Sequence, residues 1–324
     1  MTSSGFWTQL KKPFFALAPM ADVTDAAFRR IIAKYSEHGT ENGGPDVFYT
    51  EFVSCDGLCS KGREVLLRNF MYTENERPIV AQIFGDKPKN IHACARLIKN
   101  LGFDGIDINM GCPDRSVEKQ GAGAALIKDP ALAKEIIVAA KEGGGDLPVS
   151  VKTRLGYNSD TLEEWLPELL EAKPAAIALH ARTRKEMSKP AAHWDRVARA
   201  VEIARGSGVL IIGNGDVKNM EDARQKAQES GADGVMLGRA VFGNPWLFAN
   251  VVPSTEEKLR VMVEHTKLFE EILGDTKNFA VMKKHYKAYV NGFDGAKELR
   301  IKLMETKTAK DVVSVVENFL GERA

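Results

Sequence analysis

The chain has 324 residues, which is enough for one large α/β barrel with a smaller unit beside it, or for two ordinary domains. A hydrophobic content of 44% and a charged content of 27% are typical of a globular protein, and they exclude the disordered and fibrous classes. Because the formal net charge is only +1, binding of nucleic acid would require basic residues concentrated in one region.

Neither an export signal nor a membrane segment is evident. The first apolar run is broken by Pro19 and followed by Asp22, so it is too short for a secretory signal or a membrane span. The four cysteines are too few and too irregularly spaced for a disulfide framework. We therefore expect a cytoplasmic protein that does not contact a membrane.

Short apolar runs recur along the chain, and amphipathic stretches separate most of them. Each run is as long as a strand and rich in Val and Ile without alternation, which is typical of parallel strands covered on both faces. Eight strand–helix units without a dinucleotide-binding fingerprint favour a closed (β/α)8 TIM barrel over an open doubly wound α/β sheet. The predicted strands are 14–20, 46–51, 78–84, 105–110, 147–152, 175–180, 208–214 and 232–238.

The pattern changes after Pro245 and Pro253, beyond which only helical periodicity remains. Glycines separate the helical segments. This indicates a small all-α helical domain after the barrel. We predict a catalytic TIM barrel over residues 1–250 and a C-terminal helical domain over residues 251–324.

Polar or reactive residues end most of the predicted strands. In a (β/α)8 barrel the active site is built from the C-terminal ends of the strands and the loops that follow. A lysine that ends a buried apolar run, as Lys152 does, is costly unless it meets an anion or a polar partner. These strand ends therefore predict a site at the barrel mouth. Its members are Gln82, Asn109, Cys112, Lys152, His180 and Asn214.

Two glycine-bearing turns, GNGDV (213–217) and GRAVF (238–242), follow the last two predicted strands. Barrel enzymes often bind a phosphate at these positions through backbone N–H groups, and glycine allows the close approach. The pair indicates a ligand with a phosphate at one end and a polar ring across the mouth, which FMN satisfies. We expect no metal, because Cys55 and Cys59 have no second Cys or His pair beside them.

Cys112 lies in a Gly-Cys-Pro turn after the fourth predicted strand. An unperturbed thiol has a pKa of about 8.5, so it is mostly protonated at neutral pH and can act as a general acid.

Several motifs occur in an order and at spacings that resemble the tRNA-dihydrouridine synthases. They are APMADVTD, QIFG, DINMGCPD, VKTRLG, HARTR, GNGDV and GRAVFGNPWLF. The later segment KKHYKAYVNGFDGAKELRIKL resembles the RNA-binding helical domain of that family. The resemblance extends over residues 14–305.

The resemblance implies that the protein uses FMN to reduce specific uridines in tRNA, with NADPH or NADH as the reductant. Hydride would pass from flavin N5 to uracil C6, and Cys112 would deliver a proton to C5. We expect a monomer.

The resemblance also implies roles for individual residues. Asn109 would orient the uracil, and Lys152 would stabilise the anionic reduced flavin. The expected cofactor contacts are Pro19, Met20, Ala21, Gln82, Lys152, His180, Asn214, Gly215, Asp216, Gly238 and Arg239. Expected contacts with the substrate are Asn109, Arg154, Arg182 and Arg184 in the barrel, and Lys283, Lys284, Lys287 and Arg300 in the basic helical stretch.

Three segments depart from the family pattern. After HARTR the chain carries Glu186, Ser188 and Pro190, where relatives have a Gln, an aromatic residue and a Gly. The segment 38–46 resembles an inserted loop. The segment CDGLC (55–59) has no role that the resemblance assigns.

Two other functions fit part of the sequence. An FMN barrel that reduces a free pyrimidine, such as a dihydroorotate dehydrogenase, also uses an Asn-x-x-Cys-Pro element, but it needs no basic helical domain. A non-catalytic RNA-binding protein on a retained barrel would not need a thiol together with Lys152 and His180.

Overall fold

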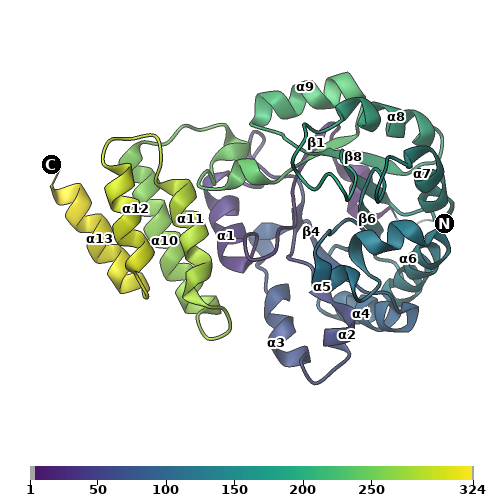
Figure 1. Cartoon of the computed structure of the whole chain (residues 1–324), viewed down its shortest axis with the longest axis horizontal. Helices are drawn as coiled ribbons and strands as arrows, with labels where there is room; N and C mark the ends of the chain where they lie inside the picture. Colours follow the sequence, from purple (N-terminus) through teal and green to yellow (C-terminus); the bar gives the residue numbers. More distant parts are fainter. Residues whose placement is uncertain (1–3, 323–324) are drawn as a thin grey trace.

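The computed structural model describes residues 4–322, and its larger part is a ring of eight parallel strands enclosed by helices (Figure 1). Neighbouring strands follow the order β1-β9-β8-β7-β6-β5-β4-β2. The ring closes where Ala16 bridges Val47 and the Leu17 N–H donates to the Val47 carbonyl at 3.0 Å. The predicted TIM barrel is confirmed. Its strands are β1 (Phe14–Leu17), β2 (Phe48–Tyr49), β4 (Ile79–Phe84), β5 (Gly105–Asn109), β6 (Val149–Arg154), β7 (Ala176–His180), β8 (Leu210–Asn214) and β9 (Gly234–Leu237).

The second predicted strand is interrupted. β2 pairs with the first half of β4, and a further short strand, β3 (Val53–Ser54), pairs with its end. Between them, Thr50 Oγ1 accepts the Gln82 N–H at 3.1 Å, so a side chain takes the place of a backbone acceptor. Glu51 follows this break, and its carboxylate accepts the Asp22 N–H at 2.6 Å.

Helices lie between successive strands because the amphipathic stretches bury their apolar faces on the outside of the ring. Side chains at the helix starts satisfy free backbone donors; Asp25, for example, accepts the Phe28 N–H at 3.0 Å. The barrel helices are α1 (Ala26–Tyr35), α4 (Pro88–Asn100), α6 (Pro130–Gly144), α7 (Leu162–Glu171), α8 (Trp194–Ala204) and α9 (Met220–Ser230), with short helices α2 (Cys55–Leu58), α3 (Arg63–Leu67) and α5 (Arg115–Glu118).

The interior of the ring is a packed core that becomes polar toward the C-terminal ends of the strands. Alternate residues of each strand face inward, so Ser150, Lys152 and Arg154 share one face of β6. Trp7 covers the N-terminal end of the ring and lies 5.6 Å from the Phe14 ring. Polar groups are therefore confined to the middle and the C-terminal end, where the candidate site lies.

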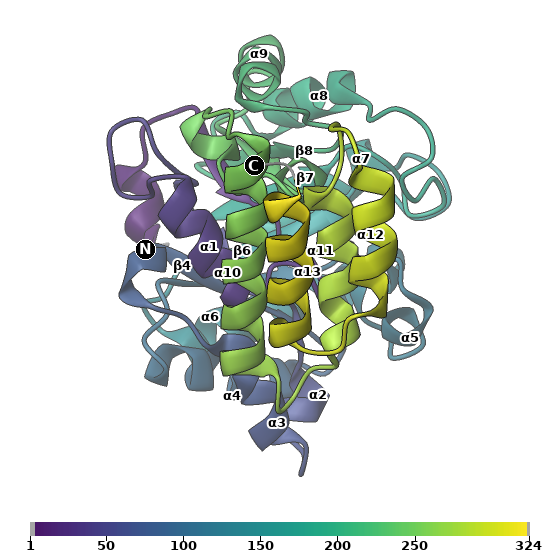
Figure 2. The ribbon, with the colours of Figure 1, turned by 90° about the vertical axis from the view of Figure 1, so that its left-hand side faces the viewer.

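Within the described residues, four longer helices follow the barrel. They stand side by side in front of it in Figure 2, and α10 packs against α1, with the Phe28 ring stacked on His265 at 4.9 Å. The helical structure after residue 250 agrees with the predicted periodicity, but the division into two domains at this point remains a prediction. The outer ends of the predicted domains, residues 1–3 and 323–324, lie outside the described residues. These C-terminal helices are α10 (Thr255–Leu273), α11 (Met282–Tyr289), α12 (Ala296–Glu305) and α13 (Ala309–Gly321).

Between residues 4 and 322, no helix is long and apolar enough to cross a membrane. Over the same part of the chain, no group of three His, Cys, Asp or Glu side chains is arranged to hold a metal ion.

Candidate active site

A cavity of about 270 Å³ opens at the C-terminal end of the barrel strands. It contains nine of the eleven predicted cofactor residues: Pro19, Met20, Lys152, His180, Asn214, Gly215, Asp216, Gly238 and Arg239. Ala21 and Gln82 are not among the lining residues, because Ala21 is exposed and Gln82 is buried inside the barrel. Ala18, Ser188, Val217 and Met236 line the cavity without having been predicted.

Lys152 brings a buried ammonium group to this cavity. Its Nζ donates to Asn214 Oδ1 at 3.2 Å, and the Asn214 amide is fixed because Nδ2 donates to the Met236 carbonyl at 2.8 Å. Among residues 4–322, Lys152 forms no ion pair. Burial and then the nearby Arg154 lower the Lys152 pKa to about 8. A buried cation with one neutral partner is suited to an anionic or polar ligand.

His180 ends β7 beside this lysine. Burial, followed by the positive charges of Lys152 and Arg154, lowers the pKa of His180 well below its ordinary value. Arg182 Nη1 lies 3.2 Å from His180 Nε2 and donates to it. The neutral ring therefore carries its proton on Nδ1.

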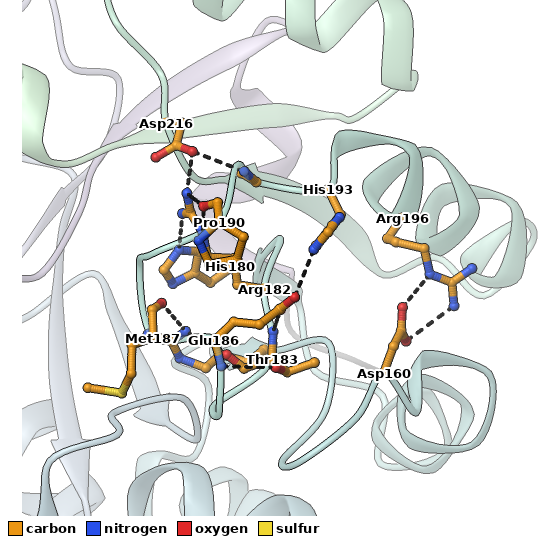
Figure 3. Close-up of polar contacts among 12 residues, drawn as sticks. Asp160, His180, Arg182, Thr183, Glu186, Met187, Pro190, His193, Arg196 and Asp216 are labelled. Atoms are coloured by element: carbon orange, nitrogen blue, oxygen red, sulfur yellow. Dashed lines mark hydrogen bonds and ion pairs between the residues drawn. The ribbon is translucent and has the colours of Figure 1, made fainter.

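The loop after β7 is held by a second set of polar contacts (Figure 3). Arg182 is buried, its Nε donates to the Pro190 carbonyl at 2.8 Å, and its guanidinium pairs with Asp216. Asp216 also pairs with Arg239 at 2.6 Å and accepts the Ala192 N–H at 2.9 Å. The structure thus joins Arg182, which was predicted to contact substrate, to residues predicted to hold cofactor.

The other two predicted arginines of the barrel also make defined contacts. Arg154 is buried and donates to the carbonyls of Gly111 (2.7 Å) and Thr183 (3.1 Å), so it ties the Cys112 turn to the loop after β7. Arg184 Nε donates to Glu118 Oε1 at 2.7 Å, and its guanidinium lies 5.1 Å from the centre of the Tyr157 ring.

A chain of hydrogen bonds runs through the barrel interior to the Cys112 turn. Gln82 Nε2 donates to Asp107 Oδ2 at 2.6 Å, and Gln82 Oε1 accepts from Asn109 Nδ2 at 3.0 Å. Asn109 Oδ1 then accepts the Cys112 N–H at 2.9 Å. Ser150 Oγ donates to the second Asp107 oxygen at 2.6 Å. Asp107 therefore fixes the orientation of both amides, and through them the turn.

Asp107 was not predicted as a site residue. Burial raises its pKa to about 6, against the opposing effect of the hydrogen bonds from Gln82 and Ser150. A charged residue in the middle of the buried apolar run GIDIN was the one sequence feature that could have identified it.

The Cys112 thiol is half-buried and is not among the residues that line the cavity. It packs against Phe84, Val117 and Ala122, and burial raises its pKa. Asn109 pairs in register with Lys152 on the neighbouring strand, which brings the turn next to the Lys152 ammonium. A thiol that stays protonated at neutral pH can donate a proton at this position.

The predicted basic residues of the helical region lie on α11 and α12. Lys284 and Lys287 are exposed, whereas Lys283 donates to the Met304 carbonyl at 2.7 Å and Arg300 to the Val290 carbonyl at 2.6 Å. Lys284 Nζ also lies 3.9 Å from Asp22 Oδ2, so α11 reaches the loop after β1 at the barrel mouth.

The cavity fits the predicted FMN in two respects. A Cβ at Gly238 would lie 3.5 Å from both Ala18 Cβ and Met20 Sδ, so glycine keeps this part of the cavity open. Lys152 and Arg239 supply two cations to the cavity lining. The carboxylate that lines the cavity belongs to Asp216 and is already paired with Arg182 and Arg239. The lining can therefore receive an anionic group.

Comparison with known proteins links this fold and site to one family. Residues 16–323 match the dihydrouridine synthase family. A probable tRNA-dihydrouridine synthase 2 of Bacillus subtilis is 40% identical over 324 residues, covering 98% of this chain and 97% of that protein. A probable tRNA-dihydrouridine synthase of Staphylococcus epidermidis is 39% identical over 322 residues, covering 97% and 96%. Among solved structures, a 6-hydroxypseudooxynicotine amine oxidase of Pseudomonas geniculata is similar in fold alone, with a TM-score of 0.54 at 11% identity, covering 81% of this chain and 53% of that one.

Proposed function

Because this chain belongs to the dihydrouridine synthase family, an oxidoreductase family, we propose that it reduces the C5–C6 double bond of specific uridines in tRNA. FMN is the bound cofactor, and NADPH or NADH is the electron donor. One structural observation carries the proposal beyond family membership: the half-buried Cys112 follows β5, whose last residue, Asn109, pairs with Lys152, and Lys152 lines the cavity. A binding protein needs neither group.

Bound FMN would supply the hydride that adds to uracil C6. The residues that line the cavity would hold and tune it: Gly215, Gly238 and Arg239 would bind the phosphate, and Lys152 would act on the electronics of the ring. Because Lys152 has no carboxylate partner within the described residues, its charge is available to an anionic ring. Gln82 is buried inside the barrel, so its effect on the site is indirect: it orients the Asn109 amide by accepting a hydrogen bond from it.

Cys112 donates its proton to uracil C5 on the face opposite the hydride. Burial keeps the thiol protonated, and the hydrogen bond from its own N–H to Asn109 fixes the turn. Both ends of the Asn109 amide are occupied by protein groups, so we propose that Asn109 orients the uracil by positioning the Cys112 turn.

The RNA lies across the barrel mouth and the C-terminal helices. Arg184, Lys284 and Lys287 contact the phosphates directly. Lys283, on α11, and Arg300, on α12, add positive charge to the surface that receives the RNA. Arg154 and Arg182 position the loops after β5 and β7, because their guanidinium groups donate to protein carbonyls. Residues 251–324 serve as the RNA-binding domain of a cytoplasmic monomer.

The test is reduction of unmodified tRNA by the purified protein, followed by mass spectrometry of the nucleosides. We expect a flavin-coloured protein, oxidation of NADPH that depends on tRNA, and a uridine that gains two hydrogen atoms. Free uracil and orotate are the controls. Reduction of a free pyrimidine without action on tRNA would identify the alternative class of FMN reductase, and a colourless protein that binds tRNA would contradict the proposed chemistry.

A further inference from the structure

Three of the four cysteines gather at a place that the proposed function does not use. Cys55 and Cys59 lie one helical turn apart at the two ends of α2, and Cys94 lies on α4, which packs against α2. This is the CDGLC segment, to which family resemblance assigns no role.

Hydrogen bonds to one backbone carbonyl bring the three residues together. The Cys55 carbonyl accepts the Cys59 N–H at 3.0 Å and the Cys94 thiol at 3.7 Å, so Cys94 Sγ lies against the turn that carries Cys59. The Cys94 thiol also interacts with the thiols of both Cys55 and Cys59. Cys55 and Cys94 are buried, whereas Cys59 is exposed.

A polar contact holds the two helices in this arrangement. Asn90 Nδ2, on α4, donates to Asp56 Oδ1, on α2, at 2.6 Å, and Lys87 pairs with the same carboxylate. The approach of Cys94 to α2 is therefore fixed by groups other than the thiols.

We propose that Cys59 and Cys94 form a reversible disulfide when the protein meets a hydroperoxide. The exposed Cys59 is oxidised first: its sulfur takes one oxygen from the hydroperoxide and becomes a sulfenic acid, and the alcohol leaves. The Cys94 sulfur then attacks the Cys59 sulfur, the S–S bond forms and water leaves. Two electrons pass from the two thiols to the hydroperoxide, and two thiols return on reduction by a dithiol.

The surroundings of the thiols support this order of events. Hydrogen bonds from Cys55 and Cys59 lower the pKa of Cys94, and the positive charge of Arg63 acts in the same direction. A thiol with a lowered pKa is a better attacking group. Burial raises the pKa of Cys59 as it raises that of Cys112, so the exposure of Cys59, and not its acidity, makes it the thiol that meets the hydroperoxide first.

The experiment uses the full-length protein, with whatever cofactor it carries when isolated. It is treated with a stoichiometric amount of tert-butyl hydroperoxide, alkylated, digested without reductant and mapped by mass spectrometry. We expect a linked pair of peptides containing Cys59 and Cys94, which dithiothreitol separates. The Cys59→Ser variant is safe for the fold because this side chain is exposed, and it should lose the linked pair entirely.

Two further variants make the test specific. Cys55→Ser should still form the Cys59–Cys94 pair. Cys94→Ser should leave Cys59 without a resolving thiol, so that the same treatment stops at a Cys59 sulfenic acid, which dimedone captures. The proposal is overturned if the main disulfide contains Cys55 or Cys112, if Cys59 is oxidised without becoming linked, or if no disulfide forms. None of these readouts depends on tRNA reduction.

Discussion

Cys112 is positioned by its backbone, so its thiol can be changed without moving the turn. The Asn109 amide accepts the Cys112 N–H, a contact that no side-chain substitution removes. We expect Cys112→Ala to keep FMN and its reduction by NADPH, but to form dihydrouridine about 10²–10⁴-fold more slowly, because only the proton donor is lost. Single-turnover rates with tRNA check this, with the exposed Cys59→Ser as the matched control. An alanine variant that works at the wild-type rate would remove Cys112 from the mechanism.

Lys152 and Arg239 line the same cavity in different environments, and their substitutions should separate retention of the cofactor from its electronics. Arg239→Ala removes one guanidinium from the proposed phosphate site. It should weaken FMN binding about tenfold to hundredfold, which is the value of one charge-assisted hydrogen bond. Lys152→Met should retain flavin but lower its reduction potential, because the anionic reduced form loses a buried cation. Equilibrium dialysis and redox titration measure the two effects. Loss of flavin at a normal potential in Lys152→Met would reverse the assignment.

At the scale of residues, the strand ends could be predicted and the contacts among them could not. Lys152, His180 and Asn214 line one cavity because parallel strands end at the same edge, which periodicity detects. Gln82 hydrogen-bonds Asp107 and Asn109 because of the directions in which these side chains point inside the ring. The order of residues in the sequence carries no information about those directions. Ser188 lines the cavity because the loop after β7 folds back, and no local sequence rule predicts that return.

The connection between α10 and α11 forms a charged contact with the barrel. Lys277 Nζ lies 2.7 Å from Glu51 Oε2, and the two side chains are only 13% and 6% exposed. The same carboxylate accepts the Asp22 N–H, in the loop that also carries Met20 of the cavity. Lys277→Met would leave this carboxylate buried without its cation. We expect the free energy of unfolding to fall by about 3 kcal/mol.

Urea unfolding measures this loss, and Arg68→Gln is the matched control. Arg68 pairs with Asp275 across the same contact between the barrel and the C-terminal helices, but both side chains are exposed, so its loss should cost no more than about 1 kcal/mol. Glu51→Gln combined with Lys277→Met should recover part of the stability, because the uncompensated charge is removed. Equal losses for Lys277→Met and Arg68→Gln would show that burial of the Lys277–Glu51 pair is unimportant.

At the scale of elements, the alternation of strands and helices was predictable because each element is long enough to show its period. The break between β2 and β3 was not predictable, because it depends on Thr50 Oγ1 accepting a hydrogen bond from Gln82, which lies 32 residues further along the chain. The short helices α2, α3 and α5 have too few residues to show a helical period.

For the whole molecule, RNA affinity should depend on salt through exposed lysines of α11. Lys287→Ala removes one predicted phosphate contact, so the slope of log affinity against log salt should flatten by roughly 0.7–0.9. Filter binding of tRNA over a salt series measures the slope. Lys99→Ala, at the end of α4, where Lys99 pairs with Asp146, should leave the slope unchanged. Equal slopes for wild type and Lys287→Ala would exclude this lysine from the RNA contact.

Stability should fall in acid because two histidines are buried where α1, α10 and α11 meet. The rings of His265 and His285 lie 4.7 Å apart, and no ring nitrogen has a hydrogen-bond partner within the described residues. Burial, then the charges of Lys284 and Lys277, lowers the pKa of His285 to about 3. The unfolded chain takes up this proton below about pH 6.5, so between pH 6.5 and 3 it binds more protons than the folded chain. The free energy of unfolding therefore falls by about 1.4 kcal/mol per pH unit from this group.

The measurement compares wild type with His285→Phe by urea unfolding at pH 6.5 and pH 5. The variant should lose about 2 kcal/mol of the pH dependence over this interval. Burial raises the pKa values of Asp25 and Asp107 to about 6, which acts in the opposite direction, but these contributions are common to both proteins and cancel in the difference. Identical pH dependence in the two proteins would mean that His285 titrates normally in the folded state.

The first and last strands of the barrel are neighbours, with Leu17 paired to Leu237, and the cavity lies across that seam. Met20 comes from the end of β1, and Gly238 with Arg239 from the end of β9. A contact between segments so distant in sequence forms late, because its loop entropy is large. During synthesis the cavity cannot exist until β9 has left the ribosome. A ligand that contacts residues after both β1 and β9 binds only the closed ring. Cofactor binding would therefore mark the completion of folding. The concentration of cofactor would set how much newly made chain persists in the closed form.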